Sequence, residues 1–164
     1  MLELNRISAG YGKQTVLDGI SVDFEKGKLT SIIGVNGCGK STLLKAILGI
    51  LSLSSGEIFI DGENLLTISR NEIAKKIAYL SQGKNIPDMT VEQMVLHGRF
   101  PYLSYPRRYS SHDREVAIKA MEAVGIAEFA HKPLYSLSGG MRQNAYIAMA
   151  LAQDTDYILL DEPT

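Results

Sequence analysis

The chain has 164 residues, of which 45% are hydrophobic and 21% are charged, and its formal net charge is −1. This length suits one domain or a compact pair of subdomains, and the composition is that of a soluble globular protein. The near-zero charge gives no support to a general affinity for nucleic acid or anionic lipid, and the single Cys38 excludes an internal disulfide and indicates a reducing, cytoplasmic compartment.

The first part of the chain is predicted to form short strands joined by turns. Hydrophobic and polar residues alternate at 2–7, 19–24 and 56–60, with glycine-containing turns beside them, which indicates an antiparallel sheet. Residues 29–33 differ, because they are mostly apolar and are followed by glycines. We therefore expect a strand there that is covered on both faces.

Helices dominate the rest of the chain. Hydrophobic spacing or a capping box predicts helices at 41–51, 69–76, from Thr90, at 112–124 and at 140–153. Short buried strands are expected at 77–80 and 157–160. Residues 100–108 (FPYLSYPRR) contain two prolines and three aromatic residues, which predicts a loop. Its rings could stack on nucleic acid, but a surface loop that packs its own rings is the favoured interpretation.

A glycine-rich segment, GVNGCGKST, stands between an expected strand and an expected helix. It fits the pattern G-x-x-x-x-G-K-[ST], in which glycines let backbone N–H groups wrap a phosphate and the helix adds its positive end. Lys40 supplies a full charge for the β- and γ-phosphates, and the Ser41 hydroxyl can coordinate Mg²⁺. The sequence thus predicts a phosphate site made by Gly34, Asn36, Gly37, Cys38, Gly39, Lys40, Ser41 and Thr42.

Two adjacent carboxylates, Asp161 and Glu162, follow the strand expected at 157–160. Adjacent acids repel one another unless a cation lies beside them, so bound Mg²⁺ is part of the predicted site. Asp161 would hold Mg²⁺ through water, and Glu162 would polarise the water that attacks the γ-phosphate.

The segment LSGGMRQ at 137–143 opens a long helix. The Ser138 hydroxyl, the bare backbone of Gly139 and Gly140 and the helix N-terminus together predict a second anion site.

These motifs, in this order and spacing, resemble the ATP-binding subunit of an ABC transporter. The resemblance rests on GVNGCGKST, on Gln82 after a strand, on LSGGMRQ and on ILLDEPT. It implies an α/β fold with a P-loop nucleotidase (RecA-like) core, an N-terminal antiparallel β subdomain and an inserted α-helical subdomain. Residues 1–86 and 154–164 would form the core with the β subdomain, and about 87–153 the helical part.

The resemblance also implies roles and cofactors, namely ATP with Mg²⁺. Tyr11 would stack on the adenine ring, and Gln82 would reach both Mg²⁺ and the attacking water. Ser138, Gly139 and Gly140 would contact the γ-phosphate of ATP held by a second copy. ATP would then lie between two chains paired head to tail, either identical chains or this one with a related ATPase subunit.

Residues from about 87 to 132 would dock a transmembrane permease subunit, which would place the chain peripherally on the cytoplasmic face of the cell membrane. HGRFPYLS at 97–104, Ser111-His112-Asp113 and residues 147–164 resemble importers of iron chelates such as ferric siderophores. No residue here is expected to touch iron, because the permease and an external binding protein select the substrate. Nucleic acid is not an expected partner.

Two other interpretations stay open. An ABC-type ATPase of DNA repair or chromosome maintenance would carry long coiled coils between Gln82 and Leu137, and about 55 residues interrupted by prolines are too few for them. The other interpretation is a module that binds ATP without turnover.

Family members continue beyond the position of Thr164, so the chain resembles a C-terminally truncated domain with its last strands missing. We expect these 164 residues alone to fold and to hydrolyse ATP poorly.

Overall fold

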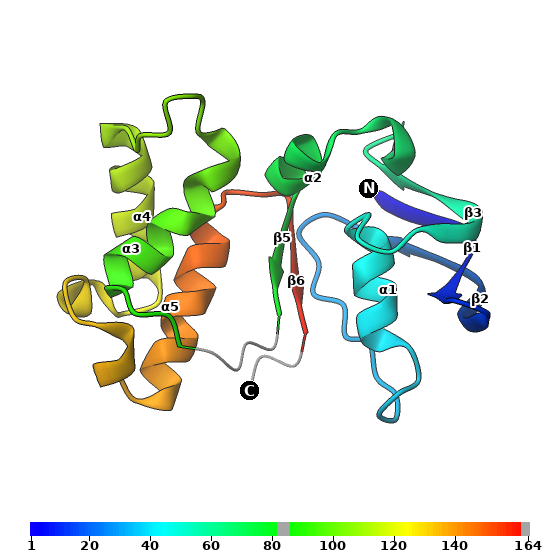
Figure 1. Cartoon of the computed structure of the whole chain (residues 1–164), viewed down its shortest axis with the longest axis horizontal. Helices are drawn as coiled ribbons and strands as arrows, with labels where there is room; N and C mark the ends of the chain where they lie inside the picture. The colour runs from blue at the N-terminus through cyan, green and yellow to red at the C-terminus, as the bar shows by residue number, and fades with distance from the viewer. Residues whose placement is uncertain (82–85, 162–164) are drawn as a thin grey trace. The chain divides into compact units, whose positions relative to one another are not determined.

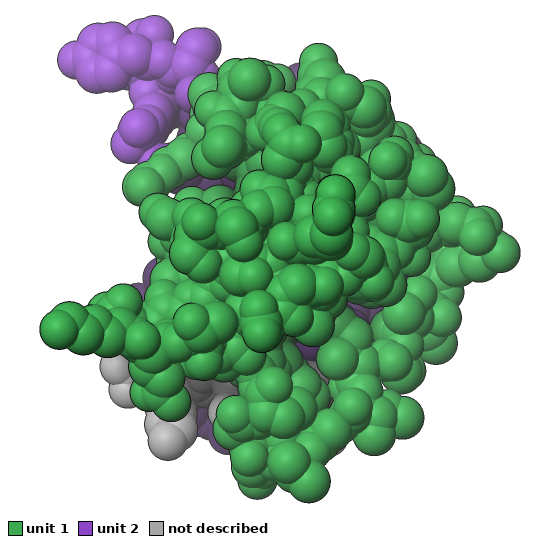
Figure 2. Space-filling view, turned by 90° about the vertical axis from the view of Figure 1, so that its right-hand side faces the viewer, with its two compact units in different colours: residues 1–73 green, residues 74–164 purple. Residues whose placement is uncertain are grey.

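The computed structural model describes residues 1–81 and 86–161. Contacts within the chain divide it into two compact units, Met1–Ile73 and Ala74–Thr164, which Figure 2 colours separately. Each unit is described by itself. The α/β class with an antiparallel β subdomain and helices is confirmed, while the division into a core and a helical insertion stays a prediction.

A twisted antiparallel sheet forms most of the first unit (Figure 1). Among the described residues its strand order is β2-β1-β3-β4. The strands are β1 (Leu2–Tyr11), β2 (Gln14–Phe24), β3 (Leu53–Ile60) and β4 (Glu63–Asn64). Central β1 pairs with both neighbours, so Leu4 lies opposite Val22 on one side and Ile58 on the other. The predicted strands at 2–7, 19–24 and 56–60 are thus confirmed, each longer than expected.

The inner face of this sheet packs against helix α1 (Lys40–Ile47). Side chains of β1 reach the core on either side of a register shift between Leu4 and Ile7. The largest fully buried side chains of this unit are Leu2, Leu4, Ile7, Ile47, Ile58 and Ile60. A 3-10 turn, η1 (Leu65–Thr67), and helix α2 (Arg70–Lys76) follow the sheet. The backbone N–H of Glu72 donates to the Ser69 hydroxyl, as the capping sequence predicts.

The strand expected at 29–33 is not formed, and that prediction is wrong. Leu29 is 97% exposed, Ile33 93% and Val35 78%. A strand covered on both faces needs neighbours that pair with its N–H and C=O groups. In the described part of the chain no strand pairs with this segment. Apolar composition indicated burial here, but pairing decides whether a strand exists.

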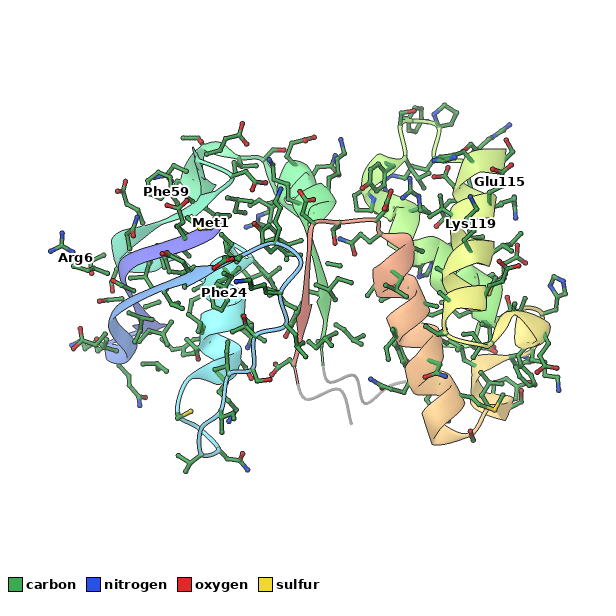
Figure 3. The ribbon with its side chains drawn as sticks, turned by 180° about the vertical axis from the view of Figure 1, so that it is seen from behind. Met1, Arg6, Phe24, Phe59, Glu115 and Lys119 are labelled. Atoms are coloured by element: carbon green, nitrogen blue, oxygen red, sulfur yellow. The ribbon has the colours of Figure 1, made fainter. Side chains whose placement is uncertain are left out.

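The second unit is mainly helical (Figure 1). Its helices are α3 (Val91–Leu96), η2 (His97–Tyr102), α4 (Ser111–Ala123), η3 (Ala127–Phe129), η4 (Leu134–Ser136) and α5 (Gly139–Ala152). They enclose a hydrophobic cluster, in which the small side chains of Ala145, Ala148 and Ala152 on α5 are fully buried. Short side chains let α3 and α4 lie close to α5. Figure 3 shows Glu115 and Lys119 one turn apart on the outward face of α4.

Close packing is sharpest at Gly98. A β-carbon built there would lie 2.2 Å from the backbone oxygen of Met149 on α5, so only glycine fits.

Strands β5 (Ile77–Leu80) and β6 (Tyr157–Leu160), both predicted, form a parallel pair beside the helices. No helix among the described residues is long and apolar enough to cross a membrane.

A buried ion pair, which the sequence did not indicate, fastens α4 to the end of α5. Arg99 Nε donates to Asp113 Oδ1 at 3.0 Å, and its Nη1 donates to the Ala152 carbonyl at 3.0 Å. The Arg99 guanidinium also stacks 3.9 Å from the Tyr102 ring centroid. Burial alone would raise the pKa of Asp113, but hydrogen bonds from Ser110 and Arg99 outweigh it and lower that pKa. The aspartate is therefore charged in the folded unit.

Candidate functional site

The glycine-rich loop lies in the first unit and leads directly into α1, which begins at Lys40. Gly37 and Gly39 have φ angles of 81° and 103°, a region that favours glycine. Gly39 is the N-cap of α1, and no side chain caps the helix there. Residues 34–38 are exposed, so the positive end of α1 opens toward solvent through a side-chain-poor loop. That is the arrangement a phosphate group requires.

Lys40 folds back over this loop. Its Nζ donates to the carbonyl oxygens of Gly34 and Val35 at 2.8 and 3.1 Å. The ammonium is thereby held above the exposed backbone, where phosphate oxygens could replace the two carbonyls as acceptors. Thr42, next but one along α1, is buried and helps to seat the helix on the sheet, while Ser41 is exposed.

Cys38 is exposed at the tip of the loop. Its backbone N–H donates to the Val35 carbonyl at 3.3 Å, which closes a tight turn through Asn36 and Gly37. The Cys38 sulfur lies against Gly34, where a β-carbon would come within 2.6 Å of it. A bulky group on this sulfur would therefore occupy the space beside the loop.

Tyr11 ends β1 in the same unit, and 49% of it is exposed. The Lys45 ammonium on α1 lies 5.9 Å from the centroid of its ring. Because Lys45 belongs to α1, the Tyr11 ring lies beside the helix that follows the glycine-rich loop. The placement suits a stacking surface near the loop.

Asp161 stands at the carboxyl edge of the parallel pair in the second unit. Leu80 and Leu160 are register partners, and the Asp161 N–H donates to the Leu80 carbonyl at 3.0 Å. The Tyr79 hydroxyl donates to Asp161 Oδ2 at 3.3 Å. Burial, and then the charge of Asp161, raise the pKa of Tyr79, so this phenol stays protonated and keeps donating. Sequence reasoning missed Tyr79, whose only signal is a hydroxyl inside an otherwise apolar strand.

Gln82 and Glu162 follow these two strand ends in the sequence and lie outside the described residues. No group of three or more His, Cys, Asp or Glu side chains arranged for a metal occurs in the described ranges. The predicted Mg²⁺ ligands, Ser41, Gln82 and Asp161, would offer a hydroxyl, an amide and a carboxylate oxygen, which are the kind of donors that Mg²⁺ prefers.

The signature segment opens α5 in the second unit. Ser138 is the N-cap, and its hydroxyl accepts from the Met141 N–H at 3.4 Å. Leu137 is buried and anchors the turn, whereas Ser138, Gly139 and Gly140 are exposed. The two glycines have no positive φ, and a β-carbon built on either meets no atom within 4 Å. The fold itself does not require glycine at these two positions, which favours close approach by something from outside the chain.

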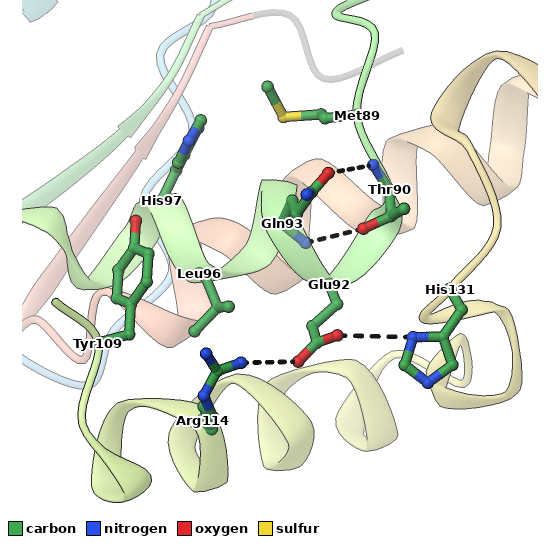
Figure 4. Close-up of a pocket in the computed structure, with 9 residues that line it drawn as sticks. All are labelled: Met89, Thr90, Glu92, Gln93, Leu96, His97, Tyr109, Arg114 and His131. Carbon is green, nitrogen blue, oxygen red and sulfur yellow. Dashed lines mark hydrogen bonds and ion pairs between the residues drawn. The ribbon is translucent and has the colours of Figure 1, made fainter.

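A groove of about 660 Å³ lies over α3 in the same unit (Figure 4). It is lined by Met89, Thr90, Glu92, Gln93, Leu96, His97, Tyr109, Arg114 and His131. The Glu92 carboxylate contacts Arg114 Nη1 at 3.4 Å and His131 Nδ1 at 3.6 Å. An apolar floor with a charged rim suits a protein partner. All nine residues fall within the range 87–132 that was expected to dock a membrane subunit.

Comparison with known proteins gives consistent results. A family model described as ABC transporter matches residues 17–164. The petrobactin import ATP-binding protein FpuD of Bacillus anthracis is 43% identical over 164 residues, which cover 99% of this chain and 60% of that protein. The iron(3+)-hydroxamate import ATP-binding protein FhuC of Bacillus subtilis is 42% identical, and the match covers 99% of this chain and 61% of that protein. This chain thus spans about 60% of the length of these relatives.

Solved structures give the same picture. One, the ADP conformation of an ATP-binding cassette of an ABC transporter, has a TM-score of 0.87 at 27% identity and covers 99% of this chain and 68% of that one. Another, a dimeric bacterial ABC transporter cassette, has a TM-score of 0.81 at 28% identity, and the match covers 100% of this chain and 75% of that one.

Proposed function

Because the chain belongs to the ABC transporter family, we propose that it binds and hydrolyses ATP as the ATPase subunit of a membrane importer. The observation that carries the proposal is the open start of α1, with Lys40 held over an exposed, glycine-rich loop. Similarity to import ATP-binding proteins for petrobactin and iron(3+)-hydroxamate supports an iron chelate, such as a ferric siderophore, as the transported substrate.

ATP binding is assigned to the loop and its neighbours. Lys40 exchanges its bonds to the Gly34 and Val35 carbonyls for bonds to the β- and γ-phosphates. Backbone N–H groups of the loop and of the first turn of α1 surround the phosphates. Tyr11 stacks on the adenine ring. The binding residues are Gly34, Asn36, Gly37, Cys38, Gly39, Lys40, Ser41 and Thr42.

Hydrolysis is assigned to the polar residues after β5 and β6. Ser41, Gln82 and Asp161 are the proposed ligands of Mg²⁺, which when bound neutralises charge on the phosphates. Glu162 accepts a proton from the attacking water, and Gln82 orients that water. Tyr79 holds the Asp161 carboxylate in place by donating to Oδ2.

The partner of the signature segment is a second ATPase subunit. Ser138, Gly139 and Gly140 contact the γ-phosphate of ATP bound to the other chain, so each chain completes the site of its neighbour. Support comes from the exposed, unhindered glycines and from the dimeric cassette among the similar structures. The groove over α3 takes a segment of the permease, which places the chain peripherally on the cytoplasmic face of the membrane.

A role in DNA repair or chromosome maintenance has less support. The longest helix in the described ranges is α5, with 14 residues, and it packs into the helical cluster. A coiled-coil arm needs far longer helices.

Nucleotide affinity tests the proposal directly. In the full chain, Lys40→Ala should weaken Mg·ATP binding at least tenfold, because a charge-assisted hydrogen bond contributes about 1.5–3 kcal/mol. Lys28→Ala is the control, since Lys28 is exposed and forms a local i,i+3 ion pair with Glu25. Titration with a fluorescent ATP analogue measures both variants. Equal affinity in wild type and Lys40→Ala would remove the basis for the assigned site.

The substrate is tested through the complex. Purification of the tagged chain from membranes should recover a permease subunit, and deletion of the gene should abolish uptake of radiolabelled iron presented as a siderophore. Normal uptake of every ferric chelate tried would rule out the iron-chelate assignment while leaving ATP binding intact.

A further inference from the structure

The segment 100–108, which we call the aromatic–arginine loop, is unusually exposed for its composition. Its first three residues form the end of η2, so the loop predicted at 100–108 begins only after Tyr102 and leads toward α4. Residues 104–108 are all exposed. Tyr105 is 96% exposed, and Phe100 and Tyr102 are 48% and 37% exposed. The expectation that the loop packs its own rings accounts for none of the Tyr105 surface. Three accessible aromatic rings on one short loop are what an interaction surface offers.

The base of the loop is fixed. The Tyr102 hydroxyl donates to the backbone oxygens of Gln153 and Asp154 at 2.9 and 3.3 Å, and its ring stacks on the buried Arg99. These contacts attach the loop to the C-terminal end of α5. The signature glycines lie at the other end of that helix, roughly 20 Å away for 14 residues. Changes at the tip of the loop should therefore leave the nucleotide-binding residues undisturbed.

The loop is positively charged. Between Phe100 and His112 the chain contains Arg107 and Arg108 and no acidic residue. The Arg107 guanidinium lies 4.5 Å from the Phe100 ring centroid. Arginine can stack on an aromatic ring and still offer N–H donors, and both arginines are exposed, so they are accessible to phosphate groups.

We propose that the aromatic–arginine loop contacts anionic phospholipid headgroups at the membrane surface. Tyr105 supplies an amphipathic ring of the type enriched at the membrane interface, and the half-exposed Phe100 adds apolar surface. The two arginines are attracted to an anionic leaflet. The inference rests on the proposed function only for bringing the chain to the membrane.

Lipid fits the loop better than nucleic acid does. Binding of a nucleic acid strand draws on a cationic groove that follows many phosphates, with open rings on which bases stack. Here there are two arginines, one of which already covers the Phe100 ring, and the chain as a whole is slightly acidic. Two arginines and a few rings give weak, salt-sensitive membrane contact, which adds to docking on a permease and does not replace it.

Vesicle sedimentation tests the proposal with the full chain. Wild type should bind vesicles of phosphatidylcholine mixed with phosphatidylglycerol, bind phosphatidylcholine alone far less, and dissociate as salt rises. The double variant Arg107→Gln with Arg108→Gln should bind the anionic vesicles about 30-fold less. Each arginine near an anionic surface contributes about 1 kcal/mol, and the sum of about 2 kcal/mol corresponds to roughly 30-fold in affinity. Tyr105→Ser should weaken binding in the same direction.

A matched double variant, Lys119→Gln with Lys132→Gln, removes the same charge from elsewhere in the second unit and should bind like wild type. An equal loss in this control, unchanged binding in the double arginine variant, or tighter binding to a single-stranded oligonucleotide than to anionic vesicles would each overturn the proposal. ATP affinity is measured on the same samples. Wild type that binds ATP but not vesicles removes this inference alone, whereas loss of Lys40-dependent ATP binding removes the proposed function.

Discussion

At the start of α5, two adjacent glycines occupy positions where alanine would fit. Glycine in a helix costs roughly 0.5–1 kcal/mol relative to alanine. Gly139 and Gly140 gain nothing in return from the fold, since their β-carbon positions are empty and their φ angles are not positive. Glycine at these positions would let a ligand approach the backbone closely.

The variant Gly139→Ala tests whether this glycine serves the fold or a ligand that approaches from outside the chain. The free energy of unfolding should stay the same or rise slightly, because the new methyl group meets no neighbour. ATP-dependent pairing of chains should fall sharply, because the methyl group stands where the second nucleotide approaches. Urea unfolding and light scattering with Mg·ATP measure the two effects. Gly98→Ala is the contrasting case, in which unfolding itself should become easier since Met149 leaves no room.

Cys38 makes the loop accessible to a chemical test, because it is the only cysteine in the chain and it is exposed. Alkylation with N-ethylmaleimide should block ATP binding by filling the space beside Gly34. Saturating Mg·ATP should slow the alkylation, since bound phosphates cover the loop. A Cys38→Ser variant should bind ATP and ignore the reagent. Unchanged ATP affinity after complete labelling would contradict the placement of the phosphates.

At the scale of elements, a buried ion pair joins three parts of the second unit. The side chains of Arg99 and Asp113 are 5% and 10% exposed, and together they join η2, α4 and the end of α5. Removing one charge leaves the other buried without its partner. Such losses cost about 3–5 kcal/mol.

Asp113→Asn should therefore lower the free energy of unfolding by about 3 kcal/mol at neutral pH. The pKa of Asp113 is lowered below its ordinary value of 3.8, so the folded state favours the carboxylate. This stabilisation is complete above the unfolded-state pKa and is lost as pH falls through the lower folded-state pKa. Urea unfolding from about pH 7 to about pH 3 should show the gap between wild type and variant closing below about pH 4. Glu115→Gln, on the outward face of α4, should show little difference at any pH.

Local sequence signals predicted most of these elements. Thr90 and Ser138 cap helices where the sequence places them, and strands at 77–80 and 157–160 form as expected. The Arg99–Asp113 pair escaped prediction because its third partner, the Ala152 carbonyl, is distant in sequence. The prediction of a strand at 29–33 was wrong for a related reason. Apolar composition predicts burial, but it carries no information on whether a neighbouring strand is present to pair with.

At the scale of the whole molecule, the motifs predicted candidate residues for each part of the site, and their roles stay predictions. The phosphate loop leads into α1 as expected, but the strand expected before it is absent. The loop and Tyr11 belong to one unit, and Asp161 and the signature belong to the other. In the proposed function the parts are combined by a second chain, and a single sequence carries no pattern that encodes such pairing. The pairing of chains is therefore the proposal that most needs a direct test.

Mixing two disabled variants provides that test. In a Glu162→Gln background, which prevents turnover, Lys40→Ala removes ATP binding and Ser138→Glu sets a carboxylate against the partner's γ-phosphate. Neither variant alone should pair in Mg·ATP. Their mixture should form pairs, because head-to-tail geometry joins the intact loop of the Ser138→Glu chain to the intact signature of the Lys40→Ala chain. Light scattering measures the pairs. If the Glu162→Gln parent pairs but the mixture stays monomeric, each ATP is not shared between a loop and the opposite signature.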